Sequence, residues 1–297
     1  MAAAKARCLE LWGLTGTLAV GADGDLARLE AYFDDVRTLV DAAANRFVPT
    51  SEISRLNDAG GEPVVVSEDF ILLLDVALEA CAMTDGLCDP TVLRALTDWG
   101  YDRDFDAIHD AAAGTARPTP GLASVVLDRE ARTVTLRDGA GLDFGATAKA
   151  WAADEVARRY GDGCLVELGG DVAVNGLNGG EPWVVGVWAR GLEREEKPPV
   201  ALTMGGLATS GVTFRTWRAG DDEAHHLIDP RTGAPARGPY AAVTVAAPSC
   251  VLANSLSTAA LVEGDLGPYR IAQAGWGARF VRHDGSTEEV GSWPTKE

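Results

Sequence analysis

The chain has 297 residues, of which 46% are hydrophobic and 24% are charged, a composition typical of a globular protein. It carries 26 lysines and arginines against 44 aspartates and glutamates, which gives a formal net charge of −18. This balance excludes the basic face that nucleic-acid binding requires, so we expect no nucleic-acid partner. Because the protein as a whole is negatively charged, an anionic ligand would have to be bound by local positive groups, namely a metal ion, a helix N-terminus or a few basic side chains.

The cysteines and the N-terminal segment bear on the cellular compartment. The five cysteines are Cys8, Cys81, Cys88, Cys164 and Cys250. Their odd number and the absence of a CxxC spacing favour buried, reduced thiols over a disulfide framework or a zinc site. No apolar run is long enough to span a membrane, and the N-terminus lacks the apolar segment of a secretory signal. We therefore expect a cytoplasmic protein that does not contact a membrane.

The first part of the chain predicts helices separated by turn-rich segments. Residues 9–20 have the pattern of one strand interrupted by glycines, and residues 25–44 have the apolar spacing of an amphipathic helix. Residues 45–57 are polar and rich in turn formers, which indicates a loop, either structural or facing a ligand. Ser67 is expected to cap a second helix that stops before residue 85.

The later part of the chain predicts mainly strands. We expect a single domain over residues 1–297. Residues 110–120, rich in turn formers, are the loosest connection and the place where this domain would divide into sub-domains. Residues 124–136 predict a β-hairpin, and residues 143–160 predict a turn followed by a helix. Further strands are expected at 165–168, 172–174, 183–187, 200–203 and 243–247, and a helix at 252–262. This order indicates an α+β protein with mixed sheets.

Three glycine-containing segments are candidates for contact with a ligand. In Asp143–Lys149, a tight turn leads into a helix N-terminus with a lysine, and this pattern fits either an anion site or a structural turn. In Gly169–Asp171 and Gly205–Gly211, the backbone can approach a flat or charged ligand closely, although plain turns have the same composition.

The histidine pair lies directly before a predicted turn. Asp229-Pro230 favours a turn, and Gly233 supplies the positive φ that closes it. Adjacent residues on a strand point to opposite faces, so at most one of His225 and His226 faces a site. The alternative is a buried pair of hydrogen-bonded histidines.

Asn254 and Thr258 are four residues apart in the helix expected at 252–262. This spacing places both side chains on one face of the helix. Their oxygens suit Mg²⁺, but helix capping and surface polarity explain such residues equally well.

Taken together, these segments resemble the FAD:protein FMN transferase family, also called the ApbE flavin transferases. The resemblance extends from about Gly16 to Gly264 and rests on the number and order of its motifs. The matching segments are Gly16-Thr17, Pro49 to Asn57, Asp89-Pro90-Thr91, Trp99-Gly100, Asp143 to Ala150, Leu168 to Asp171, Ala208 to Gly211 and His226 to Gly233.

The resemblance implies an α+β fold, related to the T-fold, in which packed α/β layers with mixed sheets form an FAD cleft. It implies an enzyme that uses Mg²⁺ to transfer FMN from FAD to a threonine or serine hydroxyl of an acceptor flavoprotein, with release of AMP. Two alternatives remain open, an FAD pyrophosphatase that produces FMN and AMP, and an FAD-binding protein without catalysis.

The resemblance also assigns roles to single residues. The metal ligands would be the Ala148 carbonyl, Asn254 and the Thr258 hydroxyl. The catalytic group would comprise His226 as acid or base, Asp229 beside the phosphates, and Lys149, which neutralises phosphate charge. The residues expected to bind FAD are Gly16, Thr17, Asp89, Lys149, Gly169, Gly170, Asp171, Thr209, Ser210 and His226.

Asn254 departs from the family pattern, which usually has an aspartate at this position. An amide oxygen still ligates Mg²⁺, but the site loses one negative charge. We therefore expect weaker metal binding unless a neighbouring acid compensates.

Overall fold

The computed structural model describes residues 4–108, 110–187 and 198–294, whose contacts group into two compact units. Unit 1 comprises Met1–Arg37, Lys149–Phe214 and Gly238–Glu297, and unit 2 comprises Thr38–Ala148 and Arg215–Arg237. Residues 110–120, considered above as a boundary, belong to unit 2, and the single domain over residues 1–297 stays a prediction. The first three residues of the N-terminal segment lie outside the described residues.

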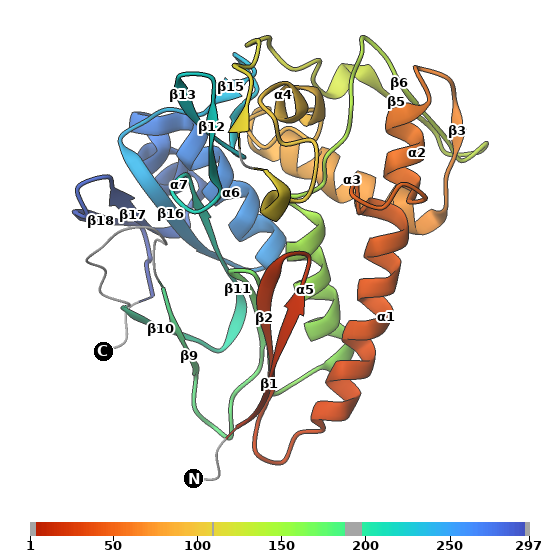
Figure 1. The fold of residues 1–297 in the computed structure, drawn as a ribbon. Helices are drawn as coiled ribbons and strands as arrows, with labels where there is room; N and C mark the ends of the chain where they lie inside the picture. Colours follow the sequence, from red (N-terminus) through yellow and green to blue (C-terminus); the bar gives the residue numbers. More distant parts are fainter. Residues whose placement is uncertain (1–3, 109, 188–197, 295–297) are drawn as a thin grey trace. The chain divides into compact units, whose positions relative to one another are not determined.

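Unit 1 contains an eight-stranded sheet in which every neighbouring pair is antiparallel (Figure 1). In spatial order its strands are β1 (Lys5–Leu11), β2 (Leu14–Val20), β7 (Cys164–Leu168), β8 (Asp171–Asn175), β11 (Met204–Gly211), β16 (Tyr240–Ala247), β17 (Gly277–Arg282) and β18 (Thr287–Val290). The strands expected from residues 165–174 and 243–247 are confirmed.

The prediction of a single interrupted strand over residues 9–20 is wrong, because β1 and β2 form a hairpin. The chain reverses at Trp12 and Gly13, which both have positive φ, 51° and 67°. Two consecutive residues of this kind form the tight turn that matches the twist of paired strands. Tryptophan seldom occupies such a position, so the sequence carried no strong turn signal there.

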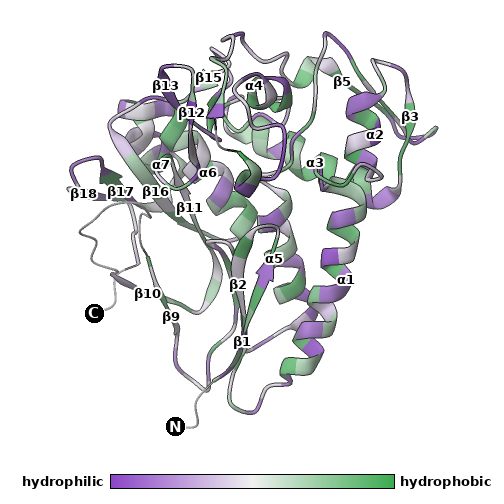
Figure 2. Ribbon diagram, in the orientation of Figure 1, coloured by the Kyte–Doolittle hydropathy of each residue, from purple (hydrophilic) through white to green (hydrophobic). Residues whose placement is uncertain are grey.

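Among the described residues of unit 1, helices are formed by α1 (Leu26–Ala44), α5 (Ala148–Tyr160), α6 (Cys250–Glu263) and α7 (Gly267–Ala274), and a 3₁₀ turn covers Gly264–Leu266. The helix predicted over residues 25–44 is confirmed as α1, whose first part lies in unit 1 and whose last part lies in unit 2. Apolar and polar positions alternate along α1 at helical spacing (Figure 2). Helix α6 packs against β11 and β16.

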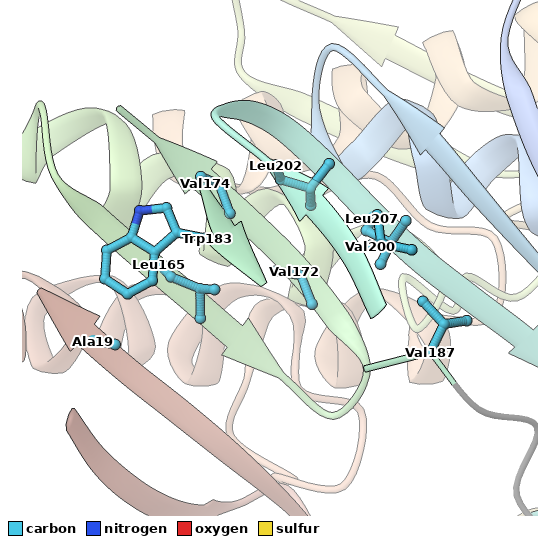
Figure 3. Packing of buried hydrophobic residues seen from close by; sticks show 9 residues of the cluster. All are labelled: Ala19, Leu165, Val172, Val174, Trp183, Val187, Val200, Leu202 and Leu207. Carbon is cyan, nitrogen blue, oxygen red and sulfur yellow. The ribbon is translucent and has the colours of Figure 1, made fainter. Parts of the chain in front are cut away.

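A two-stranded sheet of β9 (Trp183–Gly186) and β10 (Pro199–Leu202) packs on one face of the large sheet. Figure 3 shows the buried apolar side chains between them: Ala19, Leu165, Val172, Val174, Trp183, Val187, Val200, Leu202 and Leu207. Because successive side chains of a strand point to opposite faces, Asp171 and Ala173 point away from this cluster. The strand pattern of β8 therefore directs Asp171 to the other face of the sheet.

The described residues of unit 2 form helices and three small sheets. Its helices are α2 (Glu52–Asp58), α3 (Glu68–Met83) and α4 (Leu93–Asp98), with 3₁₀ turns at Phe105–Ala107 and Leu122–Ser124. Its sheets are β3 (Val64–Val65) with β6 (Thr133–Leu136) and β5 (Val125–Asp128), β13 (Asp222–His225) with β12 (Thr216–Ala219) and β4 (Asp110–Ala111), and β14 (Ile228–Asp229) with β15 (Ala234–Pro235). The hairpin expected over residues 124–136 is confirmed, and β12 and β4 pair in parallel.

The second helix begins and ends as predicted. Ser67 caps α3 by accepting a hydrogen bond from the Phe70 N–H at 3.1 Å, and the helix ends at Met83. The loop expected over residues 45–57 is only half correct, because α2 begins after Ser51, which accepts a bond from the Ser54 N–H at 3.2 Å. Polar residues form a helix here because their side chains bond to nearby backbone groups.

All five cysteines are free, and four of them are buried as expected, whereas Cys8 is exposed on β1. In the part of the chain that the structure describes, we find no helix with the length and apolar character needed to cross a bilayer.

Asn57 at the end of α2 generates a stability prediction. Its buried amide donates to the Leu142 carbonyl at 2.9 Å and accepts from the Leu142 N–H at 2.7 Å. Asn57→Ala leaves both backbone groups without these partners and should lower the free energy of unfolding by about 2 kcal/mol. The control Asp58→Ala changes the exposed neighbour on the same helix and should stay within about 0.5 kcal/mol of the unchanged protein. Equal denaturant midpoints for the two variants would contradict this role of Asn57.

Candidate functional site

Unit 1 brings four of the predicted site residues into one buried polar cluster. Lys149, in the first turn of α5, donates from Nζ to Asp171 Oδ2 at 2.6 Å. Asn254 of α6 donates from Nδ2 to Asp171 Oδ1 at 2.6 Å. One turn further along α6, Thr258 Oγ1 lies 3.4 Å from Asn254 Oδ1. The shared helix face predicted for Asn254 and Thr258 is therefore confirmed, and both side chains are buried rather than part of the surface.

The cluster continues through hydroxyl groups on β11 and α6. Ser210 Oγ lies 3.0 Å from Thr258 Oγ1 and 2.8 Å from Ser257 Oγ, and Ser257 donates to the Asn254 carbonyl. Thr209 points to the opposite face of β11, where its hydroxyl lies 2.9 Å from that of Thr244 on β16. Ser210 thus joins the cluster, whereas Thr209 does not.

The glycine turn between β7 and β8 places Asp171 at the start of its strand. Gly169 and Gly170 have φ values of 66° and 98°, which favour glycine, and the Gly169 N–H donates to the Thr15 carbonyl at 3.0 Å. Gly16 pairs with Leu168 in the adjacent strand, and a Cβ on Gly16 would lie 2.8 Å from the Glu167 carbonyl oxygen. Gly16 and Thr17 therefore lie beside the turn, at the same end of the sheet.

A carboxylate of α5 accepts hydrogen bonds from the first N–H groups of α6. Asp154 accepts hydrogen bonds from the N–H groups of Cys250 and Val251 at 2.8 and 3.0 Å. Burial raises the pKa of Asp154, while the two N–H groups act in the opposite direction. This bond pair fixes the start of α6, and with it the helix face that carries Asn254 and Thr258.

The oxygens of this cluster fit a small hard cation. Two ligands of an octahedral Mg²⁺ at a right angle, each about 2.1 Å from the ion, lie about 3 Å apart. Asn254 Oδ1 and Thr258 Oγ1 lie 3.4 Å apart, close to that spacing. Within the described residues, no group of three acidic, histidine or cysteine side chains is placed to hold a metal. Such a site would therefore use neutral oxygens of the protein, and the phosphates of a bound substrate would add negatively charged ligands to it.

In unit 2, the buried Asp89 is bonded to its own unit. Its Oδ1 accepts from the N–H and the hydroxyl of Thr91, both at 2.8 Å, and its Oδ2 accepts from the Thr119 hydroxyl at 2.5 Å. The Thr119 N–H in turn donates to the Pro230 carbonyl at 2.8 Å. Asp89 thereby links the Asp-Pro-Thr segment to the Asp-Pro turn, and its expected contact with FAD stays a prediction.

The turn after the histidine pair forms as predicted. The N–H groups of Thr232 and Gly233 donate to the Asp229 carbonyl, and Gly233 has a φ of 70°. Both carboxylate oxygens of Asp229 accept from the Arg231 guanidinium at 2.9 Å. The carboxylate proposed to lie beside the phosphates is therefore held by an arginine in this structure.

The two histidines differ in their surroundings. His225 ends β13 and is buried, with Nε2 donating to the Ala236 carbonyl at 2.9 Å and Nδ1 accepting from the Leu227 N–H at 3.3 Å. This pattern describes a neutral, structural histidine. His226 follows the end of the strand and is half-buried. That at most one of the two histidines faces a site, and that His226 is this residue, stay predictions.

The turn before α5 is organised by Asp143. Its Oδ1 accepts from the Gly145 N–H at 2.7 Å, and its Oδ2 forms an ion pair of 2.6 Å with Nε of the buried Arg46. The Arg46 guanidinium lies over the rings of Phe47 and Tyr101, and burial raises the pKa of Tyr101. These contacts account for a structural turn, and phosphate binding at this turn stays a prediction.

Several residues of these clusters were missed by the sequence analysis. Ser257 lies three residues after Asn254, so helical spacing alone placed it near the same face. Asp154, Thr119 and Arg46 had no local signal, because their partners are distant in sequence, for example 96 residues from Asp154 to Cys250 and 30 residues from Thr119 to Asp89.

Comparison with known proteins gives consistent results for most of the chain. The ApbE family profile matches residues 12–278. Several relatives carry the name FAD:protein FMN transferase. The one from Treponema pallidum is 31% identical, over 80% of this chain and 73% of the relative. The one from Klebsiella pneumoniae is 30% identical, over 84% of this chain and 75% of the relative. The crystal structure of the ApbE protein from Thermotoga maritima matches with a TM-score of 0.85 and 27% identity, covering 97% of both chains.

The structural match confirms the α+β fold expected from the sequence. The flavin transferase ApbE from Vibrio cholerae has the same fold, with a TM-score of 0.78 at 24% identity over 98% of both chains. Since the family profile covers far more than half of the residues, and the Treponema and Klebsiella relatives are each at least 30% identical, the chain belongs to the ApbE family.

Proposed function

We propose that this chain transfers FMN from FAD to a threonine or serine hydroxyl of an acceptor protein, in a Mg²⁺-dependent reaction that releases AMP. The proposal is supported by membership of the ApbE family and by relatives that carry the name FAD:protein FMN transferase. The observation that carries it is the buried chain of contacts from Lys149 through Asp171 and Asn254 to Thr258. This chain combines an ammonium group with oxygen donors, which are the groups that bind a diphosphate and its cation.

The reaction exchanges the phosphoanhydride bond of FAD for a phosphoester bond to the acceptor. The acceptor hydroxyl oxygen forms a bond to the phosphorus of the FMN half, and the bond from this phosphorus to the bridging oxygen breaks. The bridging oxygen leaves with AMP, and the hydroxyl proton passes to a base, the role that we propose for His226. With water in place of the acceptor hydroxyl, the same steps would produce free FMN and AMP.

The residues of α5 and α6 are suited to binding the diphosphate. Lys149 lies in the first turn of α5, where N–H groups and the helix dipole also favour negative charge. The Lys149 side chain is 20% exposed, and its ammonium has three N–H groups, one of which donates to Asp171. Asn254, Thr258 and the Ala148 carbonyl would hold Mg²⁺, which supplies positive charge next to the phosphates when it is bound. Gly16, Thr17, Gly169, Gly170, Asp171, Thr209 and Ser210 are proposed to contact FAD, as are Asp89 and His226 of unit 2, and Asp229 is proposed to lie beside the phosphates.

The transferase activity predicts flavin-labelled proteins that depend on this gene. Cells that carry the gene should contain at least one protein with FMN on a threonine or serine, visible as in-gel flavin fluorescence and assigned by mass spectrometry, and cells without it should not. The same flavinylated proteins in both strains would contradict the proposal. AMP release from FAD by the purified chain without any acceptor would instead favour the pyrophosphatase.

The proposed roles of His226 and Thr258 predict a loss of flavinylation without loss of the fold. In the strain without the gene, complementation with His226→Ala should restore labelling at a rate lower by about 100-fold or more, because a general acid or base contributes that much. Thr258→Ala should reduce the rate by at least about 10-fold through weaker cation binding.

Matched control variants test whether these losses are specific. His283→Ala removes an exposed histidine, and Ser255→Ala removes a hydroxyl of α6 that donates to the Val251 carbonyl. Both controls should label at the unchanged rate, and circular dichroism should show all four variants folded. Normal labelling by His226→Ala or Thr258→Ala would refute the corresponding assignment.

A further inference from the structure

The two ends of the Asn254 side chain face different partners. Nδ2 lies 2.6 Å from Asp171 Oδ1, and Oδ1 lies 3.4 Å from Thr258 Oγ1. The nitrogen and oxygen of an amide are almost equal in size, so only their hydrogen-bond partners decide which end points in which direction. An ionised carboxylate accepts hydrogen bonds and donates none, so Asp171 can face only the NH₂ end.

Asp171 is itself fixed in place by a second charged bond. Its Oδ2 accepts from Lys149 Nζ at 2.6 Å, and only 3% of its side chain is exposed. Hydrogen bonds between charged groups are short and about twice as strong as neutral ones. The ammonium of α5 therefore holds the carboxylate of β8, and the carboxylate holds the amide of α6.

The orientation of the amide decides whether Asn254 is able to bind a cation. With Nδ2 directed at Asp171, the carbonyl oxygen lies beside the Thr258 hydroxyl, and both oxygens are available to one ion. The flipped amide would present its N–H groups beside Thr258, and these carry partial positive charge. An aspartate at position 254 has two equivalent oxygens and needs no such control.

We infer that Asp171 is a positioning residue which, anchored by Lys149, turns the Asn254 amide so that its oxygen serves as a cation ligand beside Thr258. The identity of the cation as Mg²⁺ rests on the proposed function, whereas the orientation of the amide is a property of this chain alone. Asp171 thereby compensates for the missing carboxylate at position 254 through a hydrogen bond.

A double-mutant cycle separates this role from a simple effect of charge. The cycle comprises the unchanged full-length chain, Asp171→Asn, Asn254→Asp and the double variant. The dissociation constant for Mn²⁺, an ion with ligand preferences similar to those of Mg²⁺, is measured for each by electron paramagnetic resonance without FAD. The double variant exchanges the acid and the amide between positions 171 and 254 and keeps the net charge of the protein.

The cycle has a clear expected result. Asp171→Asn should weaken Mn²⁺ binding by about 10-fold or more when residue 254 is asparagine, because an asparagine at 171 no longer selects one end of the amide. In the Asn254→Asp background the same change should have little effect, or should tighten binding, since it removes a carboxylate next to another carboxylate. If Asp171→Asn weakens binding by the same factor in both backgrounds, or has no effect in either, the inference is wrong. Absence of Mn²⁺ binding by the unchanged chain would also overturn it.

Thermal unfolding provides a second readout that does not depend on activity. Asn254→Asp places two carboxylates within hydrogen-bonding distance, so its unfolding temperature should lie below that of the unchanged chain without a cation and should rise more with added MgCl₂. The double variant should lose this excess response to MgCl₂, and an equal response of all four proteins would contradict the inference. If the flavinylation test fails but the double-mutant cycle gives the expected result, the proposed function is refuted and the inference about Asp171 stands.

Discussion

The arrangement of unit 1 depends on one buried carboxylate, that of Asp171. A buried ionised group is strongly destabilising unless it is paired and hydrogen-bonded, and both oxygens of Asp171 are bonded, one to an ammonium and one to an amide. Its partners come from α5 and α6, so these two bonds tie both helices to the first residue of β8. Lys149, Asn254 and Thr258 are positioned relative to one another by the same two bonds.

Acidic side chains organise unit 2 in a similar way. Asp89 accepts three hydrogen bonds from Thr91 and Thr119, and Asp143 is paired with Arg46 and with the Gly145 N–H. These bonds fix the loops around the Asp-Pro-Thr segment and around the turn before α5. Many of the acidic side chains lie on the surface of this acidic chain, but the few that are buried hold together segments that are distant in sequence.

Asn254 gives this member of the ApbE family a cluster whose charges already balance. The one ammonium and the one carboxylate of the Lys149–Asp171 pair cancel, and the amide adds no charge. The cluster is therefore satisfied by its own hydrogen bonds, and a cation would meet an oriented dipole and hydroxyl oxygens. The nearest carboxylate, that of Asp171, lies one hydrogen bond behind Asn254.

The sequence by itself determined the α+β class, the helices at residues 25–44 and 252–262, the hairpin at 124–136 and the family, because apolar periodicity, caps and ordered motifs are local properties. Only the tertiary structure showed that residues 14–20 turn back on residues 5–11, that residues 52–58 form a helix, and that Ser210 but not Thr209 joins Asn254 and Thr258. It also paired Asp171 with Asn254, 83 residues away, and Asp89 with Thr119. A hydrogen bond between residues so far apart depends on how strands and helices pack, and no local pattern of side chains encodes it.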